Sequence, residues 1–549
     1  MKVINYSRFS ILLFLLTGTL SFVSAQKPEK VFDQLIESQY KPGEPGATVL
    51  VAKGGEVIYR SAFGMANLEL NVPMKPEMVF EIGSMTKQFT AVSILMLMER
   101  GKLSLSDEIT RFIPDYPTQD NKITIHHLLT HTSGIKSYTS MMEWAPLWRK
   151  DLAPAEMIDV FRNQPMDFGP GEKYLYNNSA YFLLGYIIEK ASGLTYQQFL
   201  EENIFKPLLM KDSYYGSQKQ IIPNRAAGYQ NQDGFTNAEY LSLTQPYSAG
   251  SIMSNVDDLL KWQIAIRDNK LVKNESIRLA FADYKLNDGK PIHYGYGWGL
   301  NDINGSSTIE HGGGIFGYTT NGIWLPKEDV YVVMLTNRDD VSPSDISTRL
   351  AAIAIGKPYP DAAEGIAIKS ESIKNLAGVY EFEDGSIRTI IYEDGILFSQ
   401  RQGSSRFKLI PVAENKFAYE NSFSALEFTG TRNGKQTVVF KNRIDQTIGS
   451  KTDKVLTEKE VISLQPDQMQ PFVGEYEIQP GFSLMVTLEN GHLMTQATGQ
   501  EKFEIFPESP VKFFLKVVDA QLVFQRNTDG KVDSLILYQG GAEIKAMKK

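Results

Sequence analysis

The 549-residue sequence contains no cysteine, no cluster of basic residues and, beyond its N-terminus, no long apolar run. The absence of cysteine excludes disulfide bonds, a thiol nucleophile, thiolate metal sites and a lipid-modified N-terminal cysteine. A formal net charge of −8 without basic clusters argues against a nucleic-acid partner. What remains, with 42% apolar and 22% charged residues, is the composition of a globular protein.

The N-terminus has the pattern of a secretory signal peptide. Lys2 and Arg8 precede an apolar run over Phe9–Val23, and small residues follow up to Ala25, where cleavage is expected. We therefore predict a signal peptide over residues 1–25 and a periplasmic or secreted mature chain without a transmembrane anchor. An uncleaved anchor is the alternative. A secreted chain of this size without cysteine fits a bacterial periplasm better than a disulfide-rich extracellular setting.

Ser84 and Lys87 form a serine-x-x-lysine motif ahead of a long apolar-periodic run. Residues three apart face the same side of a helix, so a helix opening at Ser84 would place the Lys87 amine beside the hydroxyl. A buried lysine can lose its proton and activate the serine, and backbone N–H groups at the turn can hold an oxyanion. The alternative is a chance match, because serine is also a common helix cap.

A second candidate element follows the turn signal Gly169-Pro170-Gly171. Tyr176 and Asn178 are two residues apart at the mouth of a predicted buried helix. There the phenol could carry a proton, and the amide could bind substrate or hold the lysine. The alternative is that Tyr176 packs through its ring and Asn178 caps the helix.

The third candidate element is His311 followed by three glycines, ahead of two predicted strands at 321–325 and 330–336. Glycine in or beside a strand lets another backbone or a ligand approach closely. His311 would then project over a cleft, and the N–H of Gly314 could be a second oxyanion donor. The alternative is a flexible turn with a surface histidine.

In this order, the three elements resemble the serine β-lactamase and penicillin-binding protein superfamily. The likeness is strongest to its class C-related branch of esterases, D-aminopeptidases and carboxypeptidases, and it covers roughly residues 30 to 355. Tyr176-Asn177-Asn178 stands where relatives carry Ser-Asp-Asn, and His311-Gly312-Gly313 where they carry Lys-Thr-Gly. Both departures are typical of that branch. Accessory segments fit as well, at 123–134, 248–252 and 294–298.

The resemblance implies an α+β domain, in which an antiparallel sheet carries a helical insertion, and an acyl-enzyme mechanism. Whether Lys87 or Tyr176 is the principal base stays open. No metal or organic cofactor is implied. The implied site residues are Ser84, Lys87 and Tyr176 for catalysis, and Asn178, His311, Gly313 and Gly314 for substrate binding and the oxyanion.

Two histidines have the spacing of metal ligands. His127 and His131 are four residues apart and would share a helix face. However, no Glu occupies the H-E-x-x-H position and no third ligand is close in sequence. We therefore interpret both histidines as structural.

Periodicity and turn signals predict one α+β domain over residues 28–356. Its first strands, 46–52 and 56–60, and its last strands, around His311, would join in one antiparallel sheet. Ser254 and Asp257 are spaced like a capping pair. Helices are predicted at 31–39, 84–100, 125–129, 155–163, 180–191, 256–267 and 345–355.

Beyond this domain the sequence repeats itself. Gly378-Val379-Tyr380 matches Gly474-Glu475-Tyr476 at an offset of 96 residues (474 − 378 = 96), and further anchors keep this offset. Short alternating strands with Asp-Gly and Asn-Gly turns predict two small up-and-down β-barrels, over 370–450 and 466–549. They resemble the lipocalin-like barrels found C-terminal to such hydrolases. Scaffolding or homodimer formation is favoured over a ligand pocket.

The sequence therefore predicts a secreted serine hydrolase that acts through an acyl-enzyme on a small-molecule or short-peptide substrate. His311 is mostly neutral at pH 7, whereas relatives that bind a carboxylate beside the scissile bond carry Lys there. This favours an amide or ester without that carboxylate, such as a D-aminoacyl amide, a short peptide or a small ester. The alternatives are a D-alanyl-D-alanine carboxypeptidase or class C-type β-lactamase, and a non-catalytic receptor for cell-wall peptides.

Overall fold

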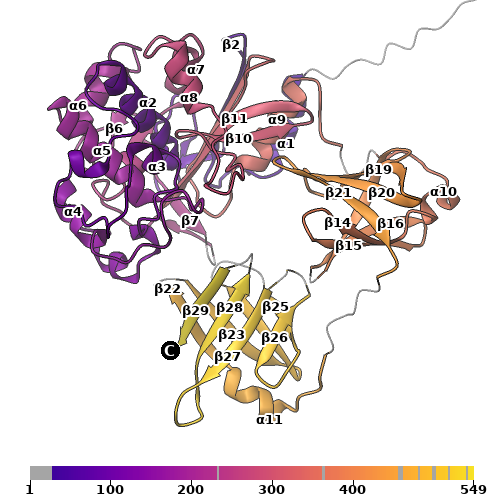
Figure 1. Ribbon diagram of the computed structural model, residues 1–549. Helices are drawn as coiled ribbons and strands as arrows, with labels where there is room; N and C mark the ends of the chain where they lie inside the picture. The colour runs from indigo at the N-terminus through magenta and orange to yellow at the C-terminus, as the bar shows by residue number, and fades with distance from the viewer. Residues whose placement is uncertain are drawn as a thin grey trace, which may run out of the picture.

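The computed structural model describes residues 28–549 apart from 232–233, 361–364, 403, 455–460, 480–481, 498–501, 517, 519 and 540–541. The predicted signal peptide over 1–25 lies outside the described residues. An N-terminal α+β domain is followed by two β-barrels, orange and yellow in Figure 1, which confirms the predicted fold class. In the described ranges, none of the helices is long and apolar enough to cross a membrane.

A six-stranded antiparallel sheet joins the two ends of the N-terminal domain. Its strand order is β10-β11-β12-β13-β1-β2. β1 pairs with β13 in a register that places Val49 opposite Met334, so the predicted sheet from both ends of the domain is confirmed. The strands are β1 (Ala47–Lys53), β2 (Glu56–Phe63), β10 (Gly299–Ile303), β11 (Ser306–Ile315), β12 (Tyr318–Leu325) and β13 (Val330–Thr336).

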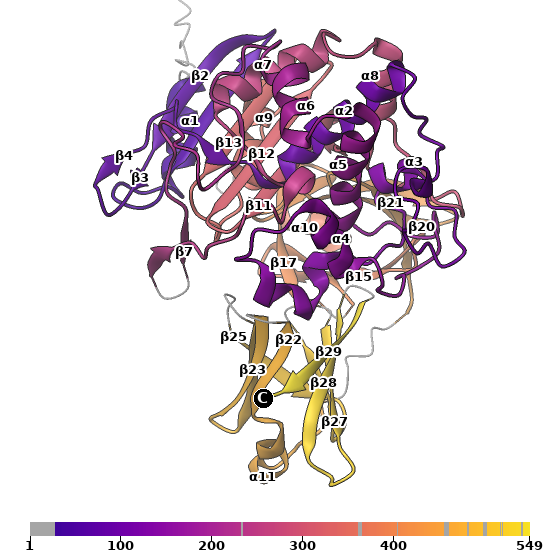
Figure 2. The same cartoon turned by 90° about the vertical axis from the view of Figure 1, so that its left-hand side faces the viewer.

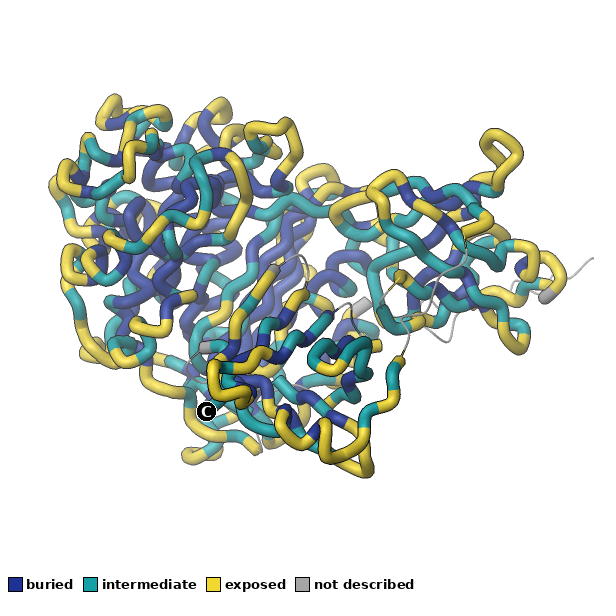
Figure 3. The backbone as a smooth tube through the Cα atoms, turned by 60° about the horizontal axis from the view of Figure 1, so that its bottom comes forward, coloured by how far each residue is buried: buried dark blue, intermediate teal, exposed yellow. Residues whose placement is uncertain are grey.

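Both faces of the sheet are covered. Val49 packs in a core with α1 (Pro28–Glu37) and α9 (Ser344–Ala354). Leu50, the next residue, points to the opposite face and joins the larger core under the other helices. All of β13 is buried for this reason, and its sequence is a continuous apolar run rather than an alternating one. Figure 3 shows the buried segments concentrated in the sheet and helices of this domain.

The helical region lies between β2 and β10 in the chain and groups on one side of the sheet (Figure 2). All the predicted helices form, and those at 125–129 and 256–267 have the observed ends. The short helices α6 and α8 are missing from the prediction. The helices are α2 (Thr86–Glu99), α3 (Ile125–Leu129), α4 (Pro154–Phe161), α5 (Asn178–Ser192), α6 (Tyr196–Leu200), α7 (Val256–Arg267) and α8 (Asn274–Ala280).

Short strands and turns connect these helices. The strands are β3 (Met65–Asn67), β4 (Val72–Pro73), β5 (Phe80–Glu81), β6 (Tyr214–Tyr215), β7 (Tyr229–Asn231), β8 (Phe235–Asn237) and β9 (Ile252–Ser254). The single turns are η1 (Gly83–Met85), η2 (Ile109–Arg111), η3 (Tyr138–Ser140), η4 (Met142–Leu147), η5 (Glu201–Phe205) and η6 (Tyr247–Ala249). Two of these turns, η1 and η6, contribute to the site described below.

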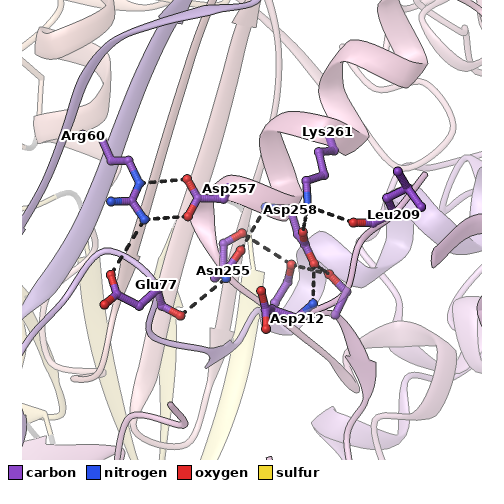
Figure 4. A network of polar contacts seen from close by, with 10 residues as sticks. Arg60, Glu77, Leu209, Asp212, Asn255, Asp257, Asp258 and Lys261 are labelled. Atoms are coloured by element: carbon purple, nitrogen blue, oxygen red, sulfur yellow. Dashed lines mark hydrogen bonds and ion pairs between the residues drawn. The ribbon is translucent and has the colours of Figure 1, made fainter. Parts of the chain in front are cut away.

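The start of α7 is fixed by a polar network (Figure 4). Asn255 is the N-cap and accepts the N–H of Asp258 at 2.9 Å, so the predicted capping pair of Ser254 and Asp257 is wrong. Asp257 instead receives two hydrogen bonds from Arg60 on β2, at 2.8 and 2.7 Å. The carboxylate of Asp258 is fully buried and accepts the N–H of Asp212 and the hydroxyl of Ser213, which directly precede β6. The network ties the helix to the sheet.

The first barrel is closed and has eight strands in sequential order, with β14 paired to β21. A short helix, α10 (Ser370–Lys374), precedes it. Its strands are β14 (Gly378–Phe382), β15 (Ile387–Glu393), β16 (Ile396–Arg401), β17 (Arg406–Ala413), β18 (Lys416–Tyr419), β19 (Ala425–Arg432), β20 (Lys435–Lys441) and β21 (Gln446–Thr452).

The second barrel repeats this topology, which confirms the duplication. Tyr380 donates to the carbonyl of Leu376 at 2.9 Å, and Tyr476 donates to that of Phe472 at 2.8 Å, at the predicted offset. The turns α11 (Pro466–Met469) and η7 (Gln470–Phe472) precede it. Its strands are β22 (Gly474–Gln479), β23 (Phe482–Glu489), β24 (His492–Ala497), β25 (Lys502–Pro507), β26 (Lys512–Leu515), β27 (Ala520–Arg526), β28 (Val532–Gln539) and β29 (Ala542–Lys548).

Candidate active site

Ser84 lies in η1, one tight turn before α2 begins at Thr86. The predicted helix start at Ser84 is therefore wrong by two residues. The reason is the preceding glycine. Gly83 has a φ of +52°, and a Cβ added to it would lie 2.9 Å from the backbone nitrogen of Gly314. The absence of a side chain at Gly83 thus lets η1 pack closely against β11.

Two backbone N–H groups can converge between η1 and β11. Ile315 and Tyr318 flank the two-residue turn of the β11–β12 hairpin. Gly314 directly precedes Ile315 on β11 and pairs with Thr319. Bonded and non-bonded pairs alternate along an antiparallel ladder, so the N–H of Gly314 points away from β12 and toward η1. The pairing of β10 with β11 stops at Glu310, which leaves this edge open. The N–H groups of Ser84 and Gly314 are the candidate oxyanion donors.

Lys87 is fully buried beside Ser84. Its Nζ lies 3.0 Å from Ser84 Oγ, 2.8 Å from Asn178 Oδ1 and 2.8 Å from the backbone oxygen of Ala249 in η6. The two carbonyl oxygens can only accept, so they take N–H bonds and leave one position of the amine facing the serine. In the neutral amine this position is the lone pair, which can take the Ser84 proton.

The charge state of Lys87 is decided by its burial. Burial lowers its pKa well below the ordinary value of 10.5. The three oxygens around Nζ favour the ammonium, but all three are uncharged, and no described carboxylate lies within ion-pair distance. Desolvation therefore dominates and favours the neutral amine, which is the form that a base requires.

Asn178 holds the lysine, one of the two roles left open by the sequence. Asn177, rather than Asn178, caps α5 by accepting the N–H of Ala180 at 2.9 Å. This frees the Asn178 side chain, whose Oδ1 accepts from Lys87 while its Nδ2 donates to Thr139 at 3.1 Å. The amide is thereby fixed in one orientation.

Tyr176 packs its ring against the lysine. Nζ of Lys87 lies 4.7 Å from the ring centroid. The phenol oxygen is buried and makes no hydrogen bond to any described residue. Burial raises the pKa of Tyr176, and the nearby Ser84 hydroxyl opposes this shift only in part. The phenol therefore stays protonated and is suited to donate a proton rather than to act as the base.

His311 lies behind the cleft wall instead of projecting over it. The residue is only 8% exposed. Its Nδ1 lies 2.5 Å from the Gly312 carbonyl, which can only accept, so Nδ1 carries the proton and Nε2 accepts from the Tyr294 hydroxyl at 3.0 Å. Burial, with a smaller effect of Lys87, lowers the pKa of His311 to about 4. A neutral imidazole in this place supplies no positive charge.

The two histidines with metal-ligand spacing do not share a helix face, because α3 ends at Leu129 and His131 has a φ of +58°. The backbone N–H of Thr124 donates to His127 Nδ1 at 3.2 Å, and that of Asn177 donates to His131 Nδ1 at 3.0 Å. Both bonds fix the orientation of the rings relative to the backbone. Within the described ranges, no cluster of three His, Cys, Asp or Glu side chains could hold a metal.

A cleft of about 420 Å³ opens at Ser84, a volume suited to a small ligand. Of the predicted site residues, Ser84, Asn178 and Gly314 line it. Sequence reasoning missed most of the wall, because these residues come from separate loops and carry no motif. The missed lining residues include Trp144, Leu241, Ile315, Phe316 and Asp339.

Residues 31–357, more than half of the chain, match the family described as Beta-lactamase. The chain belongs to the beta-lactamase family. The matched range contains every candidate site residue described above. Outside it, residues 458–548 match a domain of unknown function, DUF3471, which covers the second barrel of this beta-lactamase-family protein.

Relatives in this family include penicillin-binding proteins and aminopeptidases. Over 459 residues the chain is 28% identical to penicillin-binding protein 4* of Bacillus subtilis, covering 79% of this chain and 100% of that protein. Over 327 residues it is 28% identical to the D-aminopeptidase of Gluconobacter oxydans, covering 58% of this chain and 60% of that protein.

Solved structures with similar folds include a penicillin-binding protein homologue and an amidase. The octameric penicillin-binding protein homologue from Pyrococcus abyssi has a TM-score of 0.54 and 26% identity, over 76% of this chain and 98% of that chain. The D-amino acid amidase from Ochrobactrum anthropi has a TM-score of 0.53 over 60% of this chain and 100% of that chain. At 23% identity, the amidase shows the shared fold alone.

We expect Gly313→Ala to disrupt the candidate oxyanion site of this beta-lactamase-family protein. The added Cβ would lie 2.1 Å from the Ile82 carbonyl oxygen and 2.3 Å from Thr320 Oγ1, so β11 must move away from η1. Separating the two N–H donors should slow labelling of Ser84 by a fluorophosphonate at least about 100-fold. The labelling rate is measured by mass spectrometry.

Gly312→Ala is the matched control. Its Cβ would lie 3.4 Å from the Thr320 carbonyl oxygen, an ordinary contact. This variant should label at close to the wild-type rate. Equal rates for the two variants would show that the spacing of β11 and η1 does not set the oxyanion site.

Proposed function

We propose that this protein is a secreted serine hydrolase that acts through an acyl-enzyme on an amide or ester lacking a carboxylate beside the scissile bond. The observation that carries the proposal is the buried Lys87 amine, 3.0 Å from Ser84 Oγ, with its other hydrogen bonds taken by carbonyl oxygens. A surface lysine near a serine would stay protonated; this one has lost the water that stabilises its charge. The signal-peptide pattern supports a periplasmic or secreted location.

Acylation begins with attack of Ser84 Oγ on the substrate carbonyl carbon. Lys87 accepts the hydroxyl proton as the new O–C bond forms, and the carbonyl oxygen takes up the negative charge. The N–H groups of Ser84 and Gly314 stabilise this oxyanion. The ammonium formed on Lys87 faces the Tyr176 ring, 4.7 Å from its centroid, which favours the cation.

Tyr176 completes the proton transfer. When the bond to the leaving group breaks, the leaving group takes the phenol proton, and the Lys87 ammonium returns a proton to the phenol oxygen. Water then attacks the acyl-enzyme by the reverse sequence and releases the acid. The raised pKa of Tyr176 and the lowered pKa of Lys87 support Lys87 as the principal base.

The walls of the cleft support a substrate without a carboxylate next to the scissile bond. His311 is neutral, and its outer nitrogen is occupied by Tyr294. Among the described residues that line the cleft, Asp339 has the one charged side chain, and its Oδ2 is held by the N–H of Gly317 at 2.8 Å. A substrate carboxylate would meet this negative charge without a cation to offset it. Neutral groups or an ammonium fit better.

The lining residues Trp144, Leu241 and Phe316 are large and apolar, which favours an apolar acyl group. The similarity to penicillin-binding protein 4* over its whole length favours a second candidate, D-alanyl-D-alanine carboxypeptidase or β-lactamase activity.

A labelling experiment and a substrate screen test the proposal. A fluorophosphonate should modify Ser84, as located by mass spectrometry; a receptor without catalysis would stay unlabelled. The screen compares p-nitrophenyl esters, D- and L-aminoacyl anilides, D-Ala-D-Ala peptides and nitrocefin by kcat/KM. Neutral or amine-bearing substrates should have the highest kcat/KM. Preferred turnover of nitrocefin or D-Ala-D-Ala peptides would establish the second candidate instead.

The pH dependence of Ser84 labelling reports the base. Lys87 must be neutral to accept a proton, and its pKa is lowered well below 10.5. The labelling rate should therefore rise with pH through an inflection well below 10.5 and then stay level. No fall is expected near pH 10, because the raised pKa of Tyr176 keeps the phenol protonated there. An inflection at the ordinary lysine value of 10.5 would contradict the assignment of Lys87.

A further inference from the structure

The hairpin between β20 and β21 of the first barrel contacts the open edge of the sheet. The N–H of Asp302, on the edge strand β10, donates to the Arg443 carbonyl at 2.7 Å. In return, Arg443 Nε donates to the Asp302 carbonyl at 3.2 Å. Lys441 Nζ lies 3.1 Å from the Asp302 carboxylate. The barrel thus covers an edge that would otherwise expose unpaired backbone groups.

The same arginine reaches the next strand. Arg443 Nη2 lies 2.5 Å from Glu310 Oε2 on β11, and the two side chains are only 16% and 12% exposed. Asn301 Nδ2 donates to the other carboxylate oxygen at 2.7 Å, and Thr308 Oγ1 donates to Oε2 at 2.9 Å. Glu310 is therefore held from both sheet strands and from the barrel. A charge pair this poorly exposed is harder to break than one at the surface.

Glu310 occupies a special place on β11. It is the last residue of that strand to pair with β10, opposite Gly299. The following segment, 311–315, pairs with β12 alone and carries the candidate oxyanion donor Gly314. Fixing Glu310 therefore fixes the point from which this one-sided segment extends toward Ser84.

Away from the hairpin, Arg349 on α9 lies over the Phe423 ring of the barrel, with its Cζ 5.3 Å from the ring centroid. A cavity of about 680 Å³ separates the barrel wall from the sheet edge and the linker, with Asn304, Tyr359 and Lys416 among its lining residues. The linker closes one side, where the rings of Tyr359 and Phe423 lie 4.6 Å apart. The Arg443–Glu310 pair of the hairpin, by contrast, connects the first barrel directly to β11.

We propose that Arg443 is a positioning residue for the active site, through which the first barrel holds β11 in place via Glu310. The Gly314 N–H then keeps its place opposite Ser84. The inference goes beyond hydrolase activity, because it makes the first barrel a working part of the site rather than an appended scaffold.

Arg443→Ala tests the proposal in the full-length protein, with Arg406→Ala as the matched control. Arg406 belongs to the same barrel, and its Nη1 bonds Glu393 at 3.0 Å in an exposed pair. Arg443→Ala should slow fluorophosphonate labelling of Ser84 by about tenfold to a hundredfold, the scale expected for a small displacement of a catalytic group. Amide hydrogen exchange over 311–315 should become faster. Arg406→Ala should change neither quantity.

Glu310→Gln provides an independent readout, because it removes the other half of the ion pair. It should reproduce the defect, and the double variant with Arg443→Ala should be no worse than either single variant. Additive effects would mean that the two residues act separately, which overturns the proposal. Wild-type labelling and exchange in Arg443→Ala would also overturn it.

Folding is checked by thermal unfolding of each variant. If Arg443→Ala does not fold, Arg443→Lys is compared instead, since it keeps the charge but loses the guanidinium that bonds both Glu310 and Asp302. It must still show slower labelling and faster exchange, and wild-type values would overturn the proposal. If wild-type Ser84 does not react with the probe, the proposed function fails, whereas the exchange comparison still tests Arg443.

Discussion

Ser84→Ala is expected to abolish covalent labelling and to lower kcat/KM by on the order of 10⁴-fold or more, because the attacking oxygen is removed. The fold should be unchanged. Ser84 is only partly buried, and alanine removes the hydrogen bond between its hydroxyl and Lys87 without filling new space. Turnover is measured with the best substrate of the screen, and labelling by the mass shift of the peptide that contains residue 84.

Ser93→Ala is the matched control for this variant. Ser93 lies on α2, is fully buried, and donates to the Phe89 carbonyl at 2.8 Å, away from the cleft. Ser93→Ala should be labelled and should turn over substrate at the wild-type rates. If Ser84→Ala kept more than about a thousandth of wild-type turnover, beyond what binding and the oxyanion site alone supply, another group would be the nucleophile.

Lys87→Met is expected to have the second largest effect. Methionine fills similar space but cannot accept a proton, so labelling of Ser84 should slow on the order of 10³-fold. Lys190→Met is the control. Its Nζ lies 4.7 Å from the Tyr186 ring, the same distance as between Lys87 and Tyr176, but Lys190 is exposed and far from the serine motif in sequence. Labelling at the wild-type rate in Lys87→Met would exclude a base role.

The difference in unfolding free energy between the wild type and Lys87→Met is expected to depend on pH. The pKa of Lys87 is lowered on folding, so between 10.5 and the folded value the unfolded chain binds a proton that the folded chain does not. The unfolding free energy of the wild type therefore falls as pH falls through this window. Relative to Lys87→Met, the wild type should lose about 1.4 kcal/mol per pH unit there. Chemical unfolding at pH 10 and pH 8 measures the difference; a constant difference would mean that Lys87 stays charged.

The first barrel is expected to influence acylation from outside the cleft. If Arg443 holds β11 through Glu310, variants of the barrel change acylation without touching the cleft. Such effects separate from those of Ser84 and Lys87 by their hydrogen-exchange signature over 311–315, because the hydrogen bonds of Lys87 go to Ser84, Asn178 and Ala249 rather than to β11.

Much of the architecture follows from local sequence pattern. The helix at 256–267 and the strand at 330–336 have the predicted ends, because apolar periodicity and the residues that stop an element lie within a few positions. The 96-residue repeat, with its short alternating strands and its Asp-Gly and Asn-Gly turns, likewise predicted two barrels. The Ser84 and Lys87 pairing was visible because residues three apart in sequence must be neighbours in a helical turn.

Tertiary structure decided what those groups can do. Lys87 is a candidate base because η6 and Asn178, from distant parts of the chain, enclose its amine. The motif predicted that His311 faces the substrate, but Tyr294 bonds its Nε2 and burial lowers its pKa. The contact of Arg443 with Glu310 joins residues 133 positions apart. A local pattern specifies the element and its buried face, whereas desolvation and hydrogen-bond partners depend on which distant segments pack there.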